Sequence, residues 1–157
     1  MSAKPPILPP SIGMLAMLAV FVLHFVKPVT LLFPYPFNYI GLGFIALGAI
    51  INIMSERDLQ RFGAPFDANG QSARVVDQGL YQFSRNPGYL GIIFIAAGIT
   101  IWVGSLSPWL VVAALPVIMG RLYVCHEEQL LLNRFGDDYQ KYCQKVPRWI
   151  RISKAES

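Results

Sequence analysis

Residues 86–120 read NPGYLGIIFIAAGITIWVGSLSPWLVVAALPVIMG, a run of 35 residues without a charged side chain. A single helix of that length would extend about 52 Å at about 1.5 Å per residue, whereas the hydrocarbon core of a bilayer is about 30 Å thick. The GSLSP sequence at residues 104–108 is typical of a tight turn. We therefore predict a hairpin of two membrane-spanning helices that meet at this turn.

Two further apolar runs precede the hairpin. Residues 5–26 contain no charged side chain apart from His24 when it is protonated, and residues 28–55 contain none at all. Each run is long enough to cross a bilayer, which takes about 20 apolar residues. We predict a first span over residues 11–26 and a second over residues 38–54. Only 14% of the 157 residues are charged, against about 25% in soluble domains.

The chain is thus predicted to be an all-α integral membrane protein with about four transmembrane helices, forming a single membrane domain over residues 1–157. Residues 1–54 hold spans 1 and 2, residues 55–85 form a polar loop, and residues 86–157 hold the hairpin (spans 3 and 4) and the C-terminal helices. The last span is expected to continue into water as a helix up to Phe135. There Gly136 can end it and the residues that follow can begin a further helix.

The placement of the basic residues predicts the orientation in the membrane. The N-terminal tail, the 55–85 loop and the C-terminal region hold nearly all of the 13 lysines and arginines, while residues 28–38 and 104–108 hold none. Basic residues flank the cytoplasmic ends of spans. We therefore predict a multi-pass protein whose termini, polar loop and C-terminal helices are all cytoplasmic.

Composition and motifs exclude several classes of function. The net charge of +4 comes with no nucleic-acid-reading motif, and seven of the basic residues lie from Arg121 onward, beside the last apolar segment. We expect membrane lipids as partners and no nucleic acid. Cys125 and Cys143 are too few and too far apart for a metal site, and no metal is predicted. The motifs of soluble hydrolases, kinases and metalloproteases are missing.

The start of the hairpin is one candidate site. Asn86 suits an N-cap, Pro87 suits the first position of a helix, and Tyr89 suits a membrane interface, so a purely structural role is one interpretation. The same arrangement points the N–H groups of a helix N-terminus toward the cytoplasm. Such an end can bind an anionic group, for example the carboxylate of a ligand.

The Glu127-Glu128 pair on the last helix is the second candidate site. Consecutive residues of a helix diverge by about 100°, so only one of the two can face a given cleft. The other is expected to stay exposed or to pair with a basic neighbour. A carboxylate at this depth could accept hydrogen bonds from a ribose diol or an amine, or attract a sulfonium, but a solvated pair without function is the simpler interpretation.

Together these segments resemble the isoprenylcysteine carboxyl methyltransferase and phospholipid methyltransferase superfamily of membrane enzymes. The resemblance covers roughly residues 70–150, in order and with ordinary spacing. The matching motifs are Gly79-Leu80-Tyr81, Arg85-Asn86-Pro87-Gly88-Tyr89-Leu90-Gly91, Glu127-Glu128, Phe135-Gly136-Asp137-Asp138-Tyr139-Gln140-Lys141-Tyr142 and Val146-Pro147.

The resemblance implies that S-adenosylmethionine binds at the cytoplasmic end of the last two spans. It also implies that residues 86–157 contain the hairpin and the C-terminal cofactor-binding region. The cofactor-binding residues that it implies are Arg74, Val75, Val76, Tyr81, Asn86, Pro87, Gly88, Tyr89, Glu127 and Glu128. No residue is assigned as catalytic.

Two positions depart from the pattern of the superfamily. Asn86 stands where many relatives have histidine, and an asparagine can position a ligand but cannot act as a general base. Tyr123 stands where the eukaryotic isoprenylcysteine enzymes carry a substrate-holding arginine, and Arg121 is nearby in the sequence. Arg121 and Tyr123 are the expected substrate-binding residues, although recognition of a prenylated cysteine carboxylate does not follow from them.

The sequence therefore predicts methyl transfer to a small or lipid-like acceptor at the cytoplasmic membrane face. Two alternatives stay open. The first is an NADPH-dependent membrane reductase, since some sterol reductases have a related C-terminal half. The second is a non-catalytic membrane protein that binds a lipid or a partner. A homodimer packed through the glycine-bearing second span, with Gly41, Gly43 and Gly48, is a further expectation.

Overall fold

The structure is a computed structural model, and it describes residues 9–63 and 74–150. Its helices are α1 (Pro9–Val26), α2 (Ile40–Gly63), α3 (Pro87–Val103), α4 (Trp109–Met119), α5 (Cys125–Phe135) and α6 (Asp137–Lys145). Two short 3₁₀ helices, η1 (Phe37–Tyr39) and η2 (Gly79–Gln82), and one π-helical turn, η3 (Gly120–Val124), complete the order. No β-strand occurs in the described residues, which hold only an isolated bridge between Leu31 and Ser105. The all-α prediction is confirmed for this part of the chain.

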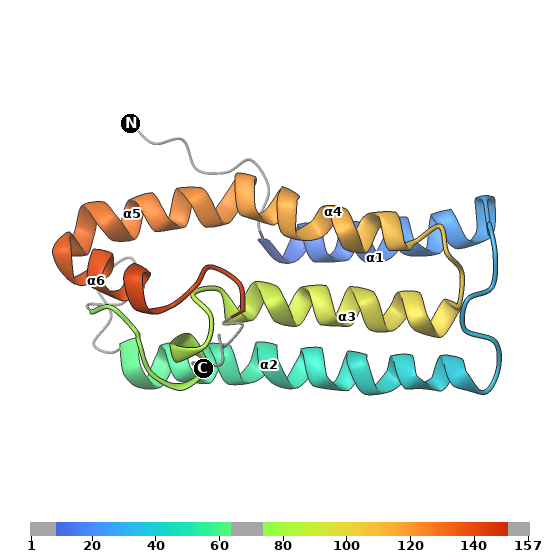
Figure 1. Cartoon of the computed structure of the whole chain (residues 1–157), viewed down its shortest axis with the longest axis horizontal. Helices are drawn as coiled ribbons and strands as arrows, with labels where there is room; N and C mark the ends of the chain where they lie inside the picture. Colours follow the sequence, from blue (N-terminus) through green and yellow to red (C-terminus); the bar gives the residue numbers. More distant parts are fainter. Residues whose placement is uncertain (1–8, 64–73, 151–157) are drawn as a thin grey trace, which may run out of the picture.

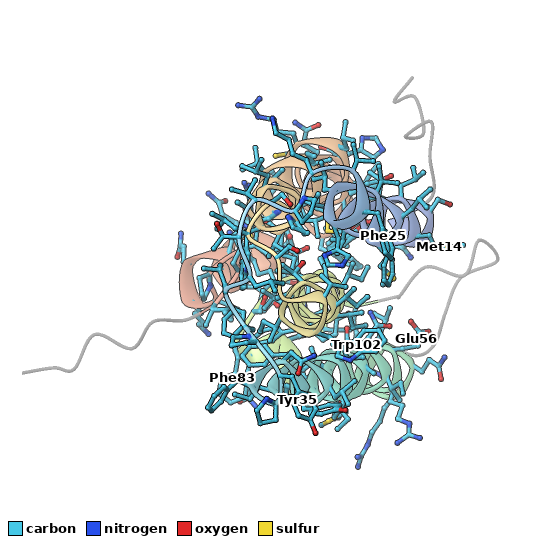
Figure 2. The ribbon with its side chains drawn as sticks, turned by 90° about the vertical axis from the view of Figure 1, so that its right-hand side faces the viewer. Met14, Phe25, Tyr35, Glu56, Phe83 and Trp102 are labelled. Atoms are coloured by element: carbon cyan, nitrogen blue, oxygen red, sulfur yellow. The ribbon has the colours of Figure 1, made fainter. Side chains whose placement is uncertain are left out.

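Helix α3 is the centre of the bundle (Figures 1 and 2). It contacts α2 on one side and both α1 and α4 on the other. The core between α1, α3 and α4 contains Ile12, Ala16, Ala96, Leu115 and Met119, all at most 8% exposed. These residues are apolar and free of charge, so the core can form within the depth of a membrane as well as in water.

The two ends of the bundle differ in character. The connection between α1 and α2 and the α3–α4 turn lie together at one end, and α5, α6 and the segment before α3 lie at the other (Figure 1). At the first end Leu32 N donates to Gly104 O over 2.7 Å, and His24 Nδ1 lies 2.6 Å from Ser105 Oγ. Lys27 is the one Asp, Glu, Lys or Arg there among the described residues. The polar end is therefore the end where a site for polar ligands can form.

The outer surface of the bundle is strongly apolar. Met14 and Phe25 on α1 and Trp102 on α3 are 71%, 77% and 43% exposed (Figure 2). Two helical stretches of the described chain, Phe37–Gly63 and Trp109–Phe135, are long and apolar enough to cross a membrane, and Ser11–Val26 and Pro87–Val103 are shorter apolar helices. Exposed apolar surface of this extent is typical of contact with lipid. The chain is a membrane-associated protein.

Turns of the predicted kind end the helices of the hairpin and of the C-terminal region. Gly104 follows α3 with φ +82°, and a Cβ there would lie 2.8 Å from Phe33 O, so glycine is required on both counts. After the turn the chain runs as a continuous helical stretch through α4, η3 and α5 to Phe135. Gly136, with φ +52°, then reverses the chain into α6. The predicted hairpin turn and the predicted end at Gly136 are both present.

Helix α2 differs from the expectation, because it continues to Gly63 rather than ending near Met54. The first residues of the expected 55–85 loop are therefore helical. Their inner side has partners in the fold: Ser55 is 4% exposed, and the Asp58 carboxylate accepts a hydrogen bond from Leu80 N over 2.8 Å. Their outer side is stabilised by a hydrogen bond from Gln60 to Glu56 at 2.9 Å.

A glycine seam joins α2 to α3. Gly41 and Gly48, seven residues apart on α2, lie against Gly98 and Gly91, seven residues apart on α3. A Cβ on Gly48 would lie 2.6 Å from Gly91 O, and one on Gly98 would lie 2.6 Å from Gly41 O. The backbones can approach this closely only because none of the four carries a side chain, which is how small residues support helix packing in membranes. Gly43, in contrast, has nothing within 4 Å of its Cβ position.

The seam predicts that two glycine substitutions on α2 differ in their effect on stability. Gly48→Ala is expected to destabilise the protein by about 1–3 kcal/mol, because the added methyl must push two backbones apart. Gly43→Ala is the matched control, and it is expected to change stability by no more than about 0.5 kcal/mol. Thermal unfolding in one detergent would compare the two variants. An equal loss for both would show that the seam does not hold α2 against α3.

Candidate functional site

The glycine seam places two polar side chains of α2 beside the start of α3. Ser55 follows Gly48 by a further seven residues, so it lies on the same face of the helix. A Cβ on Gly88 would lie 3.4 Å from Ser55 Oγ, and Asn52 Nδ2 donates to Gly88 O over 3.1 Å. Ser55 Oγ also lies 3.2 Å from Tyr81 Oη. The close packing inside the apolar region thereby sets the positions of polar groups at its edge.

The N-terminus of α3 has the predicted residues in an unpredicted arrangement. Asn86 occupies the N-cap position and Pro87 the first position of the helix, but no side chain makes a cap hydrogen bond there. The Asn86 side chain instead donates to Arg148 O over 2.9 Å. The first-turn N–H groups of Gly88 and Tyr89 therefore receive no hydrogen bond from the side chain at the N-cap position. A helix end of this kind carries partial positive charge and can receive an anionic group.

Tyr89 and Glu127 meet across the gap between α3 and α5. The Tyr89 hydroxyl donates to Glu127 Oε1 over 2.7 Å. The Tyr123 ring stacks on Tyr89 with centroids 6.2 Å apart and an interplanar angle of 26°, and Tyr123 itself is only 1% exposed. One face of Tyr89 is thus packed against Tyr123, while its hydroxyl orients the carboxylate of Glu127.

Glu128 has a different environment from Glu127. Its carboxylate forms an ion pair with Arg85 at 2.8 Å and a second one with Arg148. Arg148 Nε also donates to Glu128 Oε1 over 3.2 Å, and the Arg85 Nη1 that pairs with Glu128 also donates to Cys143 Sγ over 2.9 Å. Of the two outcomes left open by the sequence, Glu128 is therefore the glutamate that pairs with basic neighbours, and Glu127 is the one that faces α3.

Residues Pro147–Trp149, which we call the C-terminal strap, cross the start of α3. Arg85 N donates to Pro147 O over 3.0 Å, and Ser84 Oγ lies within 3.4 Å of Arg148 O. The Trp149 ring packs on the core between α1, α3 and α4. The strap is therefore bound through its backbone to the residues before α3, and through side chains to α5 and the core.

The segment before α3 is held from both sides. Gly79, with φ +62°, lies against the Asp58 carboxylate, and a Cβ at this position would collide with it. On the other side the Tyr142 hydroxyl of α6 donates to Tyr81 O over 2.7 Å. Burial raises the pKa of the Tyr81 and Tyr142 phenols above the usual value of 10.0, so both remain neutral hydroxyl groups at physiological pH.

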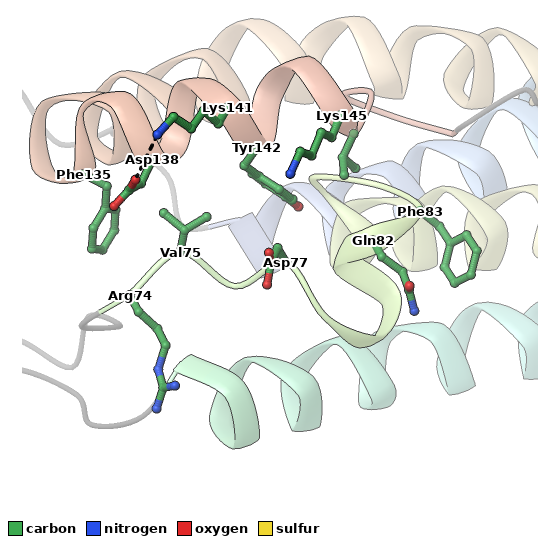
Figure 3. Close-up of a pocket in the computed structure, with 11 residues that line it drawn as sticks. Arg74, Val75, Asp77, Gln82, Phe83, Phe135, Asp138, Lys141, Tyr142 and Lys145 are labelled. Carbon is green, nitrogen blue, oxygen red and sulfur yellow. Dashed lines mark ion pairs between the residues drawn. The ribbon is translucent and has the colours of Figure 1, made fainter.

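A cavity of about 690 Å³ lies between this segment and α6 (Figure 3). Its walls combine apolar side chains with both signs of charge, among them an ion pair of 4.0 Å between Lys141 and Asp138. The residues that line it are Arg74, Val75, Asp77, Gln82, Phe83, Phe135, Asp138, Lys141, Tyr142, Lys145 and Val146. Arg74 and Val75, two of the predicted cofactor-binding residues, belong to this cavity.

The other predicted residues fall into four places. The start of α3 and the helix facing it bring together Tyr81, Asn86, Pro87, Gly88, Tyr89, Tyr123 and Glu127. Glu128 lies with the two arginines, and Val76 is buried at 8% exposure. Arg121 is exposed on η3, two residues before the buried Tyr123.

Several residues of the site were not predicted. Asn52, Ser55, Arg85, Tyr142 and Arg148 all make hydrogen bonds that order it. Ser55 extends the seven-residue spacing of Gly41 and Gly48, and Arg85 and Tyr142 lie within the motifs of the resemblance. Their partners, and the roles of Asn52 and Arg148, come from contacts between segments far apart in the sequence, which local patterns do not reveal.

Comparison with known proteins matches residues 37–138 to the phospholipid methyltransferase family. The chain is 36% identical over 62 residues to an uncharacterized protein of Haemophilus influenzae, a match that covers 40% of this chain and 98% of that protein. It is 28% identical over 117 residues to the protein-S-isoprenylcysteine O-methyltransferase of Schizosaccharomyces pombe, covering 71% of this chain and 48% of the relative. A probable protein-S-isoprenylcysteine O-methyltransferase of Oryza sativa subsp. indica is 28% identical over 114 residues, a match that covers 69% of this chain and 58% of the relative.

The chain thus spans only about half the length of the isoprenylcysteine methyltransferases that it matches. The family match, in contrast, covers well over half of this chain and includes the glycine seam, the start of α3 and the Glu127-Glu128 pair. The predicted resemblance is confirmed, and the chain belongs to the phospholipid methyltransferase family.

Proposed function

We propose that this chain is an S-adenosylmethionine-dependent methyltransferase that modifies a small or lipid-like acceptor at the cytoplasmic face of a membrane. The observation that carries the proposal is the uncapped N-terminus of α3 with the Tyr89–Glu127 pair beside it. Membership of the phospholipid methyltransferase family supports methyl transfer as the reaction.

In the proposed topology α1, α2, α3 and the α4–η3 stretch each cross the membrane. The 17 residues of α3 extend about 26 Å at about 1.5 Å per residue, close to the thickness of the hydrocarbon core. The strong difference in charge between the two ends of the bundle supports a cytoplasmic position for the polar end. The site and both termini would then lie on the cytoplasmic side.

The residues at the start of α3 fit the chemistry of S-adenosylmethionine. The uncapped N–H groups of the first turn suit the carboxylate of its methionine part. Glu127, held by Tyr89, suits a ribose diol, an amine or the positive sulfonium. The cavity that contains Arg74 and Val75 lies against the same segment as Tyr81, which agrees with the wider set of cofactor-binding residues that the resemblance implies.

When it is bound, S-adenosylmethionine supplies a methyl group on an already activated sulfonium. The task of the chain is then to orient the two reactants and to exclude water, and orientation alone can lower a barrier by about 7–11 kcal/mol. Glu127 and the α3 N-terminus would fix the donor, and the C-terminal strap would cover the site. Asn86 cannot take up a proton at neutral pH, so its role is positional: it ties the strap to α3 through Arg148 O.

The acceptor is proposed to reach the site from the membrane. Arg121, exposed on the helical turn that also carries the buried Tyr123, is placed to attract an acidic group of the acceptor at the membrane surface. Tyr123 would contribute to acceptor binding indirectly, because its ring packs on the Tyr89 ring and fixes its orientation. The isoprenylcysteine O-methyltransferases among the relatives make a carboxylate on a lipidated group one acceptor class to test. A second copy of the chain is a further proposed partner, although Gly41 and Gly48 are already in contact with α3 of the same chain.

Binding of S-adenosylhomocysteine to the purified full chain, measured by calorimetry, tests the cofactor. Glu127→Gln is expected to weaken binding about 10- to 100-fold, because a hydrogen bond to a charged group is worth about 1.5–3 kcal/mol. Glu56→Gln is the matched control, since Glu56 is an exposed residue of α2, and it should bind like the wild type. Binding of NADPH in place of S-adenosylhomocysteine would favour a reductase, and binding of neither by folded protein would favour a non-catalytic binding protein.

Tyr89→Phe tests whether the phenol acts through Glu127. The variant keeps the ring that stacks on Tyr123 but loses the hydrogen bond to the carboxylate, and we expect about tenfold weaker binding of S-adenosylhomocysteine. In a Glu127→Gln background the same change should have little additional effect, because the two residues form one unit. Tyr39→Phe, at the opposite end of the bundle, is the control. Fully additive losses would contradict the coupling.

A further inference from the structure

Helix α2 has two opposite faces, each repeating every seven residues. The inner face is the seam of Gly41, Gly48 and Ser55 against α3. The outer face carries, at alternating steps of four and three residues, Gly43, Leu47, Ile50, Met54, Arg57 and Arg61, which we call the outer stripe. Every member of the outer stripe is exposed, and Leu47, Ile50 and Met54 are 45%, 53% and 44% exposed.

The outer stripe changes abruptly from apolar to basic. Up to Met54 it holds no charge, and its next two positions are both arginine. Because α2 is one of the two stretches suited to crossing a membrane, the change marks the level where the hydrocarbon ends and the headgroups begin. The two arginines lie one turn apart, about 6 Å along the helix axis, so both can reach a single phosphate.

Neither arginine has an acidic partner elsewhere in the part of the chain that the structure describes. The Arg61 guanidinium lies over the Phe62 ring at 5.2 Å, and the Arg57 side chain makes no hydrogen bond or ion pair with another described residue. The carboxylates of the neighbouring residues have other partners: Glu56 accepts a hydrogen bond from Gln60, and Asp58 accepts one from Leu80 N. Figure 2 shows Glu56 on the flank of α2.

A shallow hollow accompanies the two arginines. It has a volume of about 530 Å³ and is lined by Met54, Arg57, Asp58, Gln60 and Arg61. Its wall thus combines an apolar side chain, a neutral amide and two guanidinium groups with one carboxylate, which is held by the Leu80 N–H. Among the described residues, only α2 lines the hollow, and none of these lining residues belongs to the cavity beside α6.

We propose that the hollow binds an anionic phospholipid of the bilayer, with its phosphate between Arg57 and Arg61 and an acyl chain along Ile50 and Met54. The proposal goes beyond methyl transfer and rests only on α2 crossing the membrane. Guanidinium groups bind phosphate through paired hydrogen bonds, and basic residues at the headgroup level favour anionic lipids. A soluble anion would use the two arginines but would gain nothing from the apolar part of the outer stripe, so a lipid is the occupant that fits both parts.

Lipid selectivity of the full chain tests the site. Detergent-purified protein is titrated with short-chain phosphatidylglycerol or phosphatidylcholine, and bound lipid is measured by native mass spectrometry. Wild type is expected to prefer phosphatidylglycerol. R57Q and R61Q should each reduce this preference about 3- to 5-fold and the double variant about 10- to 30-fold, since one basic residue contributes about 1 kcal/mol. R57K/R61K should retain most of it.

K141Q/K145Q is the matched control, because it removes the same charge from α6 and should keep the preference. An unchanged preference in R57Q/R61Q, or an equal loss in K141Q/K145Q, would overturn the proposal. The proposal would also be overturned if glycerophosphate bound as tightly as the lipid, or if the preference were lost only because a dimer dissociated. S-adenosylhomocysteine binding by R57Q, R61Q and R57Q/R61Q should not change, and its absence in wild type would count against the proposed methyltransferase without affecting the lipid result.

Discussion

The rest of the structure depends on the backbone contact between α2 and α3. In a membrane, lipid is as apolar as the side chains it meets, so helices associate through close packing rather than through exclusion of water. Four glycines allow that packing here, with Gly48 and Gly91 so close that a single methyl group would collide. The contact also fixes the register of the two helices. Asn52 and Ser55 lie beside the start of α3 for this reason.

The polar end follows from the need to satisfy buried polar groups at the edge of the apolar bundle. Arg85 N and the Asn86 amide both donate to carbonyl groups of the C-terminal strap, and Glu128 is bound by the two arginines at its sides. Each of these groups would be costly if it were buried without a partner. Because Asn86 is used in this way, it does not cap α3. The same hydrogen bonds that hold the strap therefore leave the helix N-terminus without a cap from Asn86.

Adjacent glutamates have separate tasks because a helix turns by about 100° per residue. Glu127 faces α3 and accepts from Tyr89, whereas Glu128 faces Arg85 and Arg148. The π-helical turn η3 comes directly before them and carries Tyr123, which stacks on Tyr89. Turns of this kind occur often at functional sites, where they change the direction in which the following residues point. Tyr123, which packs on Tyr89, and Glu127, which accepts its hydroxyl, are thus positioned by one short stretch of helix.

Local composition, spacing and motifs were sufficient to predict the helical class, the α3–α4 turn at Gly104, the helix end at Gly136 and the family. The motifs also indicated the residues at the start of α3 and the Glu127-Glu128 pair. Three features emerged only from the folded structure: α2 continues to Gly63, Gly48 rather than Gly43 meets α3, and the Asn86 side chain binds the strap. A polar segment such as residues 55–63 is compatible with either a helix or a loop. Each glycine of α2 is likewise compatible with the face toward α3 or with the opposite face. Contacts between distant segments, which no local pattern encodes, select one outcome.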